Sequence, residues 1–510
     1  MYGTRDGIPY LILIVPMCWA ACTPAIVEPL RVQELAQSTP STTVTPESTA
    51  ASSAEEPATI QAILTPPSEP CLELVEIDRA DYGRLRVVYS THCVSDLDFT
   101  PTRLWLWDEE TRSAVPFPLP DDAIGPRLSA DQSMIVFRRD VDETDKEIWV
   151  MNSNGQNERR LVILPLNKIR KRFPGANAID MQYGWVQETH TVFYQTRPLF
   201  ELDQAPFDTI VLTDAETGES RAIVPPGEVY TRAFSPDGNQ LAALGLSEVR
   251  LIDTGNAQLQ SVIPLSSSYV ENPLNFSPDG KLLTVLTPSG VAIIDTTNGR
   301  RREVVVDYIL WGAGDSFLYM AALQWRDNET FVMIAAPPIE VPVEGLDLFA
   351  ELLDWEFVVY QVDATRGAIR ALQTLRGSYP SAALSPNLDC LAFVRFVPDS
   401  NTQEKYLAEL YLADLATGEL TLYTAGNQVS YFKWGPDSRR FVYALMIEGQ
   451  WKAYLGEVDR EPIPFDVSPY SIMWVDAERF LAQRSYANLE LHLFSIYGED
   501  ILIESIQPNE

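Results

Sequence analysis

Histidine is scarce in this sequence, with three residues among 510. His92, His190 and His492 lie far apart, and the chain contains no H-E-x-x-H and no C-x-x-C segment. Zinc sites in proteins usually show such closely spaced ligands, so we expect no metal centre. Gly312 and Gly314 form an isolated glycine pair that does not make a phosphate-binding loop, and we expect no cofactor.

Positive charge is also in short supply. The chain has 38 Lys and Arg against 71 Asp and Glu, which gives a net charge of −33 at pH 7. Such a surface repels phosphate backbones and anionic lipid headgroups, so the composition argues against a nucleic-acid partner.

The apolar stretch near the N-terminus is too short to cross a bilayer. Ile8–Ala21 has 14 residues, whereas a transmembrane helix needs about 20. The length suits a signal peptide, which we place at residues 1–21. The following segment, Trp19-Ala20-Ala21-Cys22, resembles a bacterial lipobox, although Trp19 departs from its usual aliphatic residue. The resemblance implies lipidation of Cys22; the alternative is an ordinary signal peptide that is cut nearby.

Residues 22–70 have few large apolar side chains and are rich in Ser, Thr, Pro, Ala and Glu. Such a segment cannot bury enough surface to offset the entropy of ordering, so we expect a disordered tether that proline keeps extended. With a lipid on Cys22, the tether would hold the folded part outside the cytoplasm, anchored to a bacterial cell membrane at the surface or in the periplasm.

Cysteine is rare in the remaining chain, residues 71–510. An oxidising compartment would allow a disulfide between Cys71 and Cys93, which lie 22 positions apart. Cys390 lies in an apolar run and is expected to be a strand thiol.

A repeated unit is the most informative feature that the sequence does contain. The segment F-S-P-D-G occurs at Phe234–Gly238 and again at Phe276–Gly280. A looser unit, an aromatic residue or Leu, then a turn and an apolar strand, occurs eight times at spacings of 40 to 59. Its copies begin at Leu128, Trp185, Phe234, Phe276, Trp325, Leu384, Trp434 and Trp474.

The acidic residues of this turn have two possible roles. Asp237 and Asp279 could be metal ligands or catalytic acids, but their repetition in register favours turn formation, with Gly238 and Gly280 closing the turn. A second Asp-led turn follows another apolar strand in most units. Its clearest Asp and Gly residues are Asp214 and Gly218, Asp295 and Gly299, Asp363 and Gly367, and Asp414 and Gly418.

Two hairpins per unit make a four-stranded antiparallel sheet that cannot bury both faces alone. We therefore expect an all-β chain with a single β-propeller over residues 71–510, of about eight blades and within seven to nine. A degenerate unit at Cys71–Leu119 lacks the S-P-D-G turn. It is either a further blade or a source of strands that close the ring.

Together, S-P-D-G, an apolar strand and D-x-x-T-G resemble the repeat of TolB-type propellers, relatives of the WD-repeat propellers. The resemblance covers about Leu128–Ile506 and implies a binding or scaffolding ring. Similar repeats precede the hydrolase domain of prolyl-oligopeptidase-like peptidases, but no G-x-S-x-G elbow occurs in this sequence.

These features favour a monomeric, membrane-anchored module, not an enzyme, that binds a protein, peptide or glycan on one end face of the ring. The insertions Phe200–Asp208, Pro337–Asp354 and Pro398–Lys405 are candidate contact loops. The alternative is an extracytoplasmic carbohydrate-active hydrolase or lyase that uses the central channel. Such an enzyme needs paired carboxylates or a tyrosine nucleophile, and no catalytic set stands out from the turn aspartates.

Overall fold

The structure is a computed structural model, and all of its described residues lie in the compact unit Pro67–Glu510. Described are residues 72–81, 85–95, 98–141, 145–172, 178–187, 189–199, 209–224, 229–265, 274–287, 290–306, 309–310, 323–336, 355–377, 382–398, 406–447, 450–467, 472–484 and 489–506. The predicted signal peptide, Cys22, the tether, Cys71 and almost all of the three insertions lie outside these residues.

The described residues form nine antiparallel sheets, each built from consecutive strands. Blade 1 comprises β1 (Leu72–Asp81), β2 (Arg86–Ser95), β3 (Asp98–Asp108) and β4 (Ser113–Pro116). Blade 2 comprises β5 (Ile124–Leu128), β6 (Met134–Asp140), β7 (Asp145–Asn152) and β8 (Arg159–Pro165). Blade 3 comprises β9 (Ala178–Trp185), β10 (Thr191–Leu199), β11 (Thr209–Asp214) and β12 (Ser220–Val224). A short helix, α1 (Leu166–Arg172), follows β8.

Blade 4 comprises β13 (Thr231–Phe234), β14 (Gln240–Leu244), β15 (Glu248–Asp253) and β16 (Leu259–Pro264). Blade 5 comprises β17 (Asn275–Phe276), β18 (Leu282–Thr287), β19 (Gly290–Asp295) and β20 (Arg301–Val305). Blade 6 comprises β21 (Ile309–Leu310), β22 (Leu323–Trp325), β23 (Thr330–Ala336), β24 (Trp355–Asp363) and β25 (Ala368–Gly377). In blade 6, β21 and β22 both pair with β23.

Blade 7 comprises β26 (Ala382–Leu384), β27 (Cys390–Pro398), β28 (Tyr406–Asp414) and β29 (Leu420–Gly426). Blade 8 comprises β30 (Gln428–Trp434), β31 (Arg440–Ile447), β32 (Gln450–Glu457) and β33 (Ile463–Phe465). Blade 9 comprises β34 (Met473–Trp474), β35 (Arg479–Gln483), β36 (Leu489–Ser495) and β37 (Asp500–Ile506).

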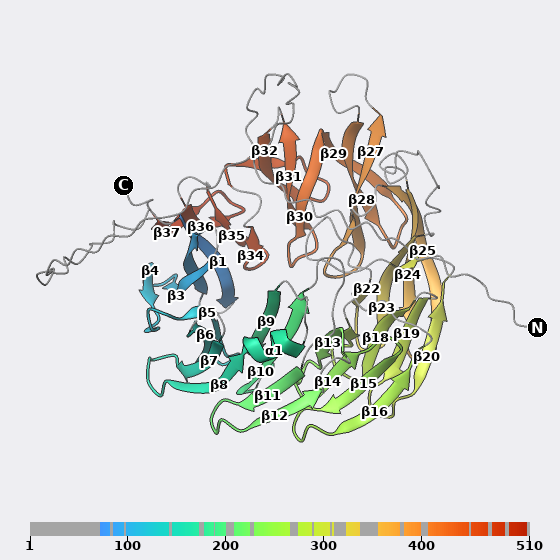
Figure 1. The fold of residues 1–510 in the computed structure, drawn as a ribbon. Helices are drawn as coiled ribbons and strands as arrows, with labels where there is room; N and C mark the ends of the chain where they lie inside the picture. Colours follow the sequence, from blue (N-terminus) through green and yellow to red (C-terminus); the bar gives the residue numbers. More distant parts are fainter. Residues whose placement is uncertain are drawn as a thin grey trace, which may run out of the picture. The chain divides into compact units, whose positions relative to one another are not determined.

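The blades are arranged in a propeller ring, with the first strand of a blade toward the centre and the fourth at the rim (Figure 1). This confirms the predicted all-β propeller, with the blade count at nine within the range of seven to nine. The degenerate unit at Cys71–Leu119 contributes a blade of its own, β1 to β4, and none of its described strands joins another sheet.

Each blade packs both of its faces against neighbours, which explains why its central strands are apolar at successive positions. Along β14, Leu241 and Ala243 belong to the hydrophobic cluster shared with blade 3, and Ala242 and Leu244 to the cluster shared with blade 5. Side chains alternate between the faces of a strand, so a strand covered on both sides is apolar at every position.

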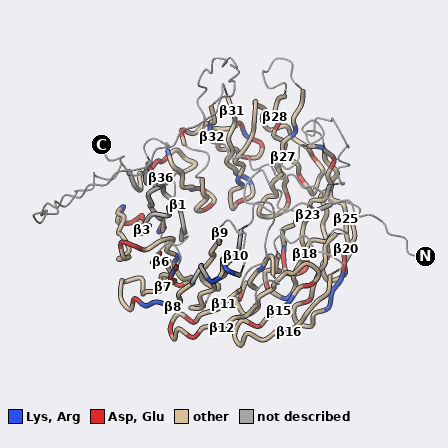
Figure 2. The backbone as a smooth tube through the Cα atoms, in the orientation of Figure 1, with Lys and Arg blue, Asp and Glu red and all other residues tan. Residues whose placement is uncertain are grey.

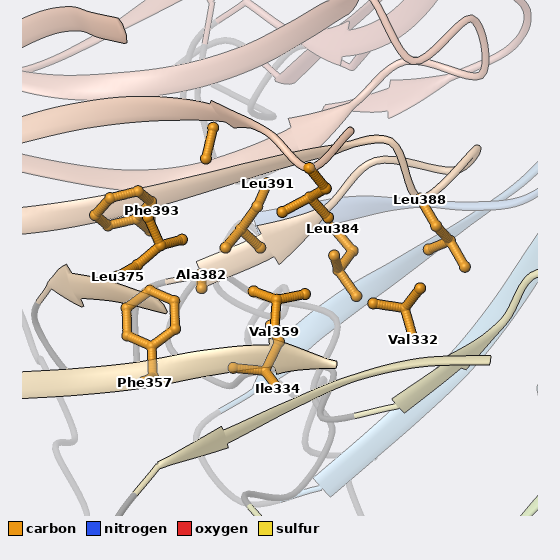
Figure 3. Packing of buried hydrophobic residues seen from close by; sticks show 12 residues of the cluster. Val332, Ile334, Phe357, Val359, Leu375, Ala382, Leu384, Leu388, Leu391 and Phe393 are labelled. Carbon is orange, nitrogen blue, oxygen red and sulfur yellow. The ribbon is translucent and has the colours of Figure 1, made fainter. Parts of the chain in front are cut away.

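Nine such clusters lie between consecutive blades in the described part of the chain. Figure 3 shows the one between blades 6 and 7, where Phe357 and Val359 face Leu384, Leu391 and Phe393. The Phe357 and Phe393 rings meet edge to face with centroids 5.5 Å apart, an arrangement that adds stability beyond the area buried.

In the described part of the chain, the first and last blades meet through side chains. Tyr89 and Trp107 of blade 1 pack against Leu481 and Leu493 of blade 9 in one buried cluster. No strand is exchanged between the described sheets, so stability at this junction depends on burial and on polar contacts.

The topology separates two ends of the ring. The turn end carries the hairpins between first and second strands and between third and fourth strands, including both repeated Asp-led turns. The linker end carries the remaining connections. The insertions predicted to contact a partner attach there, because they join second strands to third strands.

The described residues do not test the predicted disulfide or the predicted lipid anchor. Cys93 lies in β2, opposite Glu73 of β1, but its predicted partner Cys71 is outside the described part of the chain. Cys390 begins β27, is half-buried and has a free thiol. No described helix is long and apolar enough to cross a membrane.

Candidate binding site

The S-P-D-G aspartates are engaged by their own turns. Asp237 Oδ1 accepts hydrogen bonds from Ser235 Oγ at 2.6 Å and from the Asn239 main-chain N–H at 3.1 Å. Gly238, with φ at +71°, donates its N–H to the Ser235 carbonyl at 2.8 Å. The hydrogen bond from Ser235 holds the pKa of Asp237 below its ordinary value. The carboxylate therefore stays ionised at neutral pH and cannot donate a proton as a general acid.

The second copy of this turn repeats the geometry. Ser277 Oγ lies 2.8 Å from Asp279 Oδ1, which also accepts from the Lys281 N–H at 3.1 Å. Gly280 has φ at +72° and donates to the Ser277 carbonyl at 2.8 Å. These distances belong to a self-contained turn and do not bring the two aspartates together.

The second class of Asp-led turn is equally local. In each of the four turns, the aspartate Oδ1 accepts from main-chain N–H groups two or three residues later, and the glycine N–H donates to the aspartate carbonyl. The pairs are Asp214 with Gly218, Asp295 with Gly299, Asp363 with Gly367, and Asp414 with Gly418. In the structure, the aspartates singled out in the sequence therefore stand apart around the turn end, each within its own hairpin.

One cluster that sequence reasoning missed joins blades 2 and 3. His190 Nε2 lies 3.0 Å from Asp131 Oδ2 and 3.2 Å from Ser133 Oγ, and His190 Nδ1 lies 3.1 Å from Glu216 Oε1. The carboxylates of Glu216 and Asp131 outweigh desolvation and raise the pKa of His190. Neighbouring blades contribute these residues, and their spacing in the sequence does not predict that they meet.

The cluster resembles a Ser-His-Glu triad in outline but not in its hydrogen bonding. Ser133 Oγ donates to Asp131, at 2.8 Å to Oδ2, and Asp131 also faces His190 Nε2. An imidazole nitrogen that donates to a carboxylate cannot accept the serine proton, so the serine is not activated as a nucleophile. The arrangement serves as a polar link between blades.

A hollow with a volume of about 440 Å³ lies at the first strands of blades 4 to 6, near the turn end. Its described lining residues are aromatic, aliphatic and amide-bearing, and none of these is titratable. The lining residues are Gln187, Ala233, Phe234, Pro236, Leu274, Asn275, Phe276, Leu323, Gln324 and Trp325.

Two aromatic residues of the hollow, Phe234 and Trp325, also contact residues that do not line it. The guanidinium of Arg232 lies 4.2 Å from the ring centroid of Phe193 and 5.7 Å from that of Phe234. Arg232 Nε also donates to Gln195 Oε1. Burial lowers the pKa of Arg232 to about 10, so the side chain remains charged at neutral pH. Trp325 packs edge to face against the fully buried Phe331, with centroids 5.2 Å apart.

Sequence reasoning found the repeat positions that form the hollow but not the hollow itself. Phe234, Phe276 and Trp325 each begin a repeat unit, and each was identified only as the residue before a turn. The described residues contain no group of three or more His, Cys, Asp or Glu side chains arranged to hold a metal ion.

Comparison with known proteins does not assign the chain to a family. No protein-family model matches it, and no curated protein matches it. Three similar solved structures show how low the sequence identity and structural similarity are. An oligogalacturonate lyase from Vibrio parahaemolyticus is 11% identical with a TM-score of 0.36, over 65% of this chain and 85% of that one.

The other two are equally remote. A dipeptidyl peptidase 4 from Porphyromonas gingivalis is 12% identical with a TM-score of 0.41, over 66% of this chain and 50% of that one. A dihydro-heme d1 dehydrogenase is 12% identical with a TM-score of 0.40, over 80% of this chain and 77% of that one. At these values no activity, ligand or partner carries over to this chain.

Proposed function

We propose that this chain is a membrane-anchored lipoprotein whose propeller binds a ligand or partner at one end face of the ring. The observation that carries the binding role is the lining of the hollow. Aromatic and amide side chains recognise a ligand by stacking and hydrogen bonding, whereas acid–base catalysis requires titratable groups near the ligand. The described lining residues include the first set and none of the second.

The anchoring role rests on the sequence. A short apolar stretch, a lipobox-like Trp19–Cys22 and an extended tether up to residue 70 form a coherent set for display at a cell envelope. A binding ring held away from the membrane can reach envelope components, and the tether sets that reach.

The anchor is tested by producing the full chain in a bacterium and analysing its N-terminal peptide by mass spectrometry. We expect a diacylglyceryl-modified Cys22 and recovery in the membrane fraction, with release from the membrane in Cys22→Ser. Exported protein with an unmodified thiol at Cys22 would refute the anchor.

The binding role is tested separately with the purified full chain. We expect saturable, reversible binding to a component of the native envelope fraction and no turnover of that component. Measurable hydrolysis or lyase cleavage of a glycan, without a stable complex, would overturn the binding role in favour of the carbohydrate-active alternative.

A further inference from the structure

The hollow is built from equivalent positions of three successive repeats. Phe234, Phe276 and Trp325 occupy the first position of their units, at the ends of β13, β17 and β22. These three aromatic residues border one depression of about 440 Å³, and each also packs against a different hydrophobic cluster between blades. Ligand pockets typically enclose roughly 300–1,000 Å³, so this volume accommodates a short oligomer or a small ring system.

Two amides of the hollow are available to a ligand. Gln187 is exposed and Gln324 is half-buried, and neither side chain hydrogen-bonds to another described residue. The wall beside them is already fixed, since the Asn275 carbonyl accepts from Trp325 Nε1 at 3.2 Å and from Thr284 Oγ1 at 3.1 Å. The wall is therefore fixed, and the two amides keep their capacity to donate hydrogen bonds to a ligand and to accept them from it.

Charge restricts the class of ligand. None of the described lining residues is Lys, Arg, Asp or Glu, so none of them neutralises an ionic ligand. The chain as a whole carries −33, and acidic residues recur around the ring (Figure 2). This field disfavours anionic ligands before they reach the hollow. A cation would be attracted by this field, but the described lining offers no carboxylate to pair with it, so we consider an uncharged ligand.

We infer that the hollow is a subsite for a neutral saccharide. A sugar ring offers an apolar C–H face to the aromatic side chains, and its hydroxyl edge both donates and accepts hydrogen bonds, as side-chain amides do. This inference rests on the proposed binding function and names its ligand class. An uncharged peptide is the competing occupant and forms an arm of the test.

The test measures binding of the full chain by calorimetry. The probes are neutral hexasaccharides of glucose (β-1,4 and α-1,4), N-acetylglucosamine and mannose, with oligogalacturonate as the anionic probe and a proline-rich peptide as the competing class. We expect one neutral saccharide to bind saturably and oligogalacturonate not to bind. Gln324→Ala and Trp325→Phe should each weaken binding by about tenfold, the worth of one good contact.

Trp434→Phe is the matched control. Trp434 and Trp325 occupy the same repeat position, and each indole N–H bonds to the preceding blade, but only Trp325 lines the hollow. Trp434→Phe should keep the wild-type affinity, and a loss equal to that of Trp325→Phe would attribute both to stability and overturn the subsite.

The outcomes also separate this inference from the proposed function. If no neutral saccharide binds, but the chain still binds the peptide or an envelope component with Gln324→Ala unaffected, the saccharide subsite is wrong and the binding function stands. If the chain binds nothing and cleaves a glycan instead, both fall.

Discussion

Trp434 of blade 8 donates its indole N–H to the main-chain carbonyl of Ala383 in blade 7, at 3.0 Å. The same relationship recurs at three other blades, where the acceptor again immediately precedes the first residue of the preceding repeat unit. These bonds join Trp185 to Arg127, Trp325 to Asn275, and Trp474 to Lys433. The repeat position that reads as aromatic or Leu is therefore also a site of hydrogen bonding between blades.

Replacing Trp434 with Phe should lower the free energy of unfolding by roughly 1–2 kcal/mol, because the variant loses this hydrogen bond and some buried ring area. Denaturant unfolding measures the change. Trp451→Phe is the control, since the Trp451 ring packs edge to face on Tyr431 and its indole N–H makes no hydrogen bond to a described residue. Equal losses in the two variants would show that the bond between blades contributes nothing.

Replacing Asp237 separates a turn role from a chemical one. Blade 7 has Asn387 at the equivalent position, where it accepts from Ser385 Oγ at 2.8 Å and from the Asp389 N–H at 3.0 Å. Asp237→Asn should therefore keep the turn and lose less stability at neutral pH than Asp237→Ala, which should lose about 1 kcal/mol. Equal destabilisation by Asn and Ala in thermal unfolding would contradict the turn role.

The same pair has a defined pH dependence. The folded-state pKa of Asp237 lies below its ordinary value. The advantage of aspartate over asparagine is therefore present above about pH 4 and is lost as the pH falls through the folded-state pKa. Unfolding of both proteins in acid should converge, and a gap that widens on acidification would be inconsistent with this linkage.

His190 should stabilise the contact between blades 2 and 3 mainly when it is protonated. Its pKa is raised by Glu216 and Asp131. Its contribution is complete below its unfolded pKa of about 6.5 and is lost as the pH rises through the higher folded value. His190→Gln should thus be less stable than wild type near pH 6 and approach it near pH 9, as followed by denaturant unfolding. Glu216→Gln should shrink the difference at the lower pH.

The junction between the first and last blades offers a test of ring closure. Arg479 Nη1 lies 2.9 and 3.0 Å from the two carboxylate oxygens of Glu109, a residue 370 positions away. Burial lowers the pKa of Arg479, but Asp476 and Glu109 outweigh it and raise the pKa overall.

A double-mutant cycle with Arg479→Met and Glu109→Gln should give a coupling energy of up to about 1 kcal/mol that declines with added salt. Arg250 and Glu248, 2.7 Å apart within one strand, provide a control pair that does not bridge blades. Hydrogen exchange in β2 and β35 should accelerate only in the Arg479 and Glu109 variants. Unchanged exchange there would mean that this pair does not hold the ring closed.

The turns could be predicted because their interactions are local. Ser235, Asp237 and Gly238 satisfy one another within four residues, so residue type and spacing suffice to recognise the hairpin. The first blade was harder to identify because it lacks the S-P-D-G turn. Its role as a full blade rests on buried residues such as Tyr89 and Trp107, whose partners lie almost 400 positions later.

The candidate site was not predictable in the same way. Gln187 and Trp325 line one hollow although 138 positions separate them in the sequence. His190 meets Asp131 across 59 positions. Loop insertions make the repeat spacing irregular, so no fixed interval signals which side chains from different blades converge.

By itself, the sequence determined the local structure of this protein: apolar strands, Asp-led turns and their repetition. Each of these turns is specified by contacts within a few residues. Only the tertiary structure decided that nine sheets form the ring, how the first meets the last, and which aromatic and amide groups share a hollow. The physical reason is that a blade cannot bury its faces alone, so these contacts exist only once all its neighbours are in place.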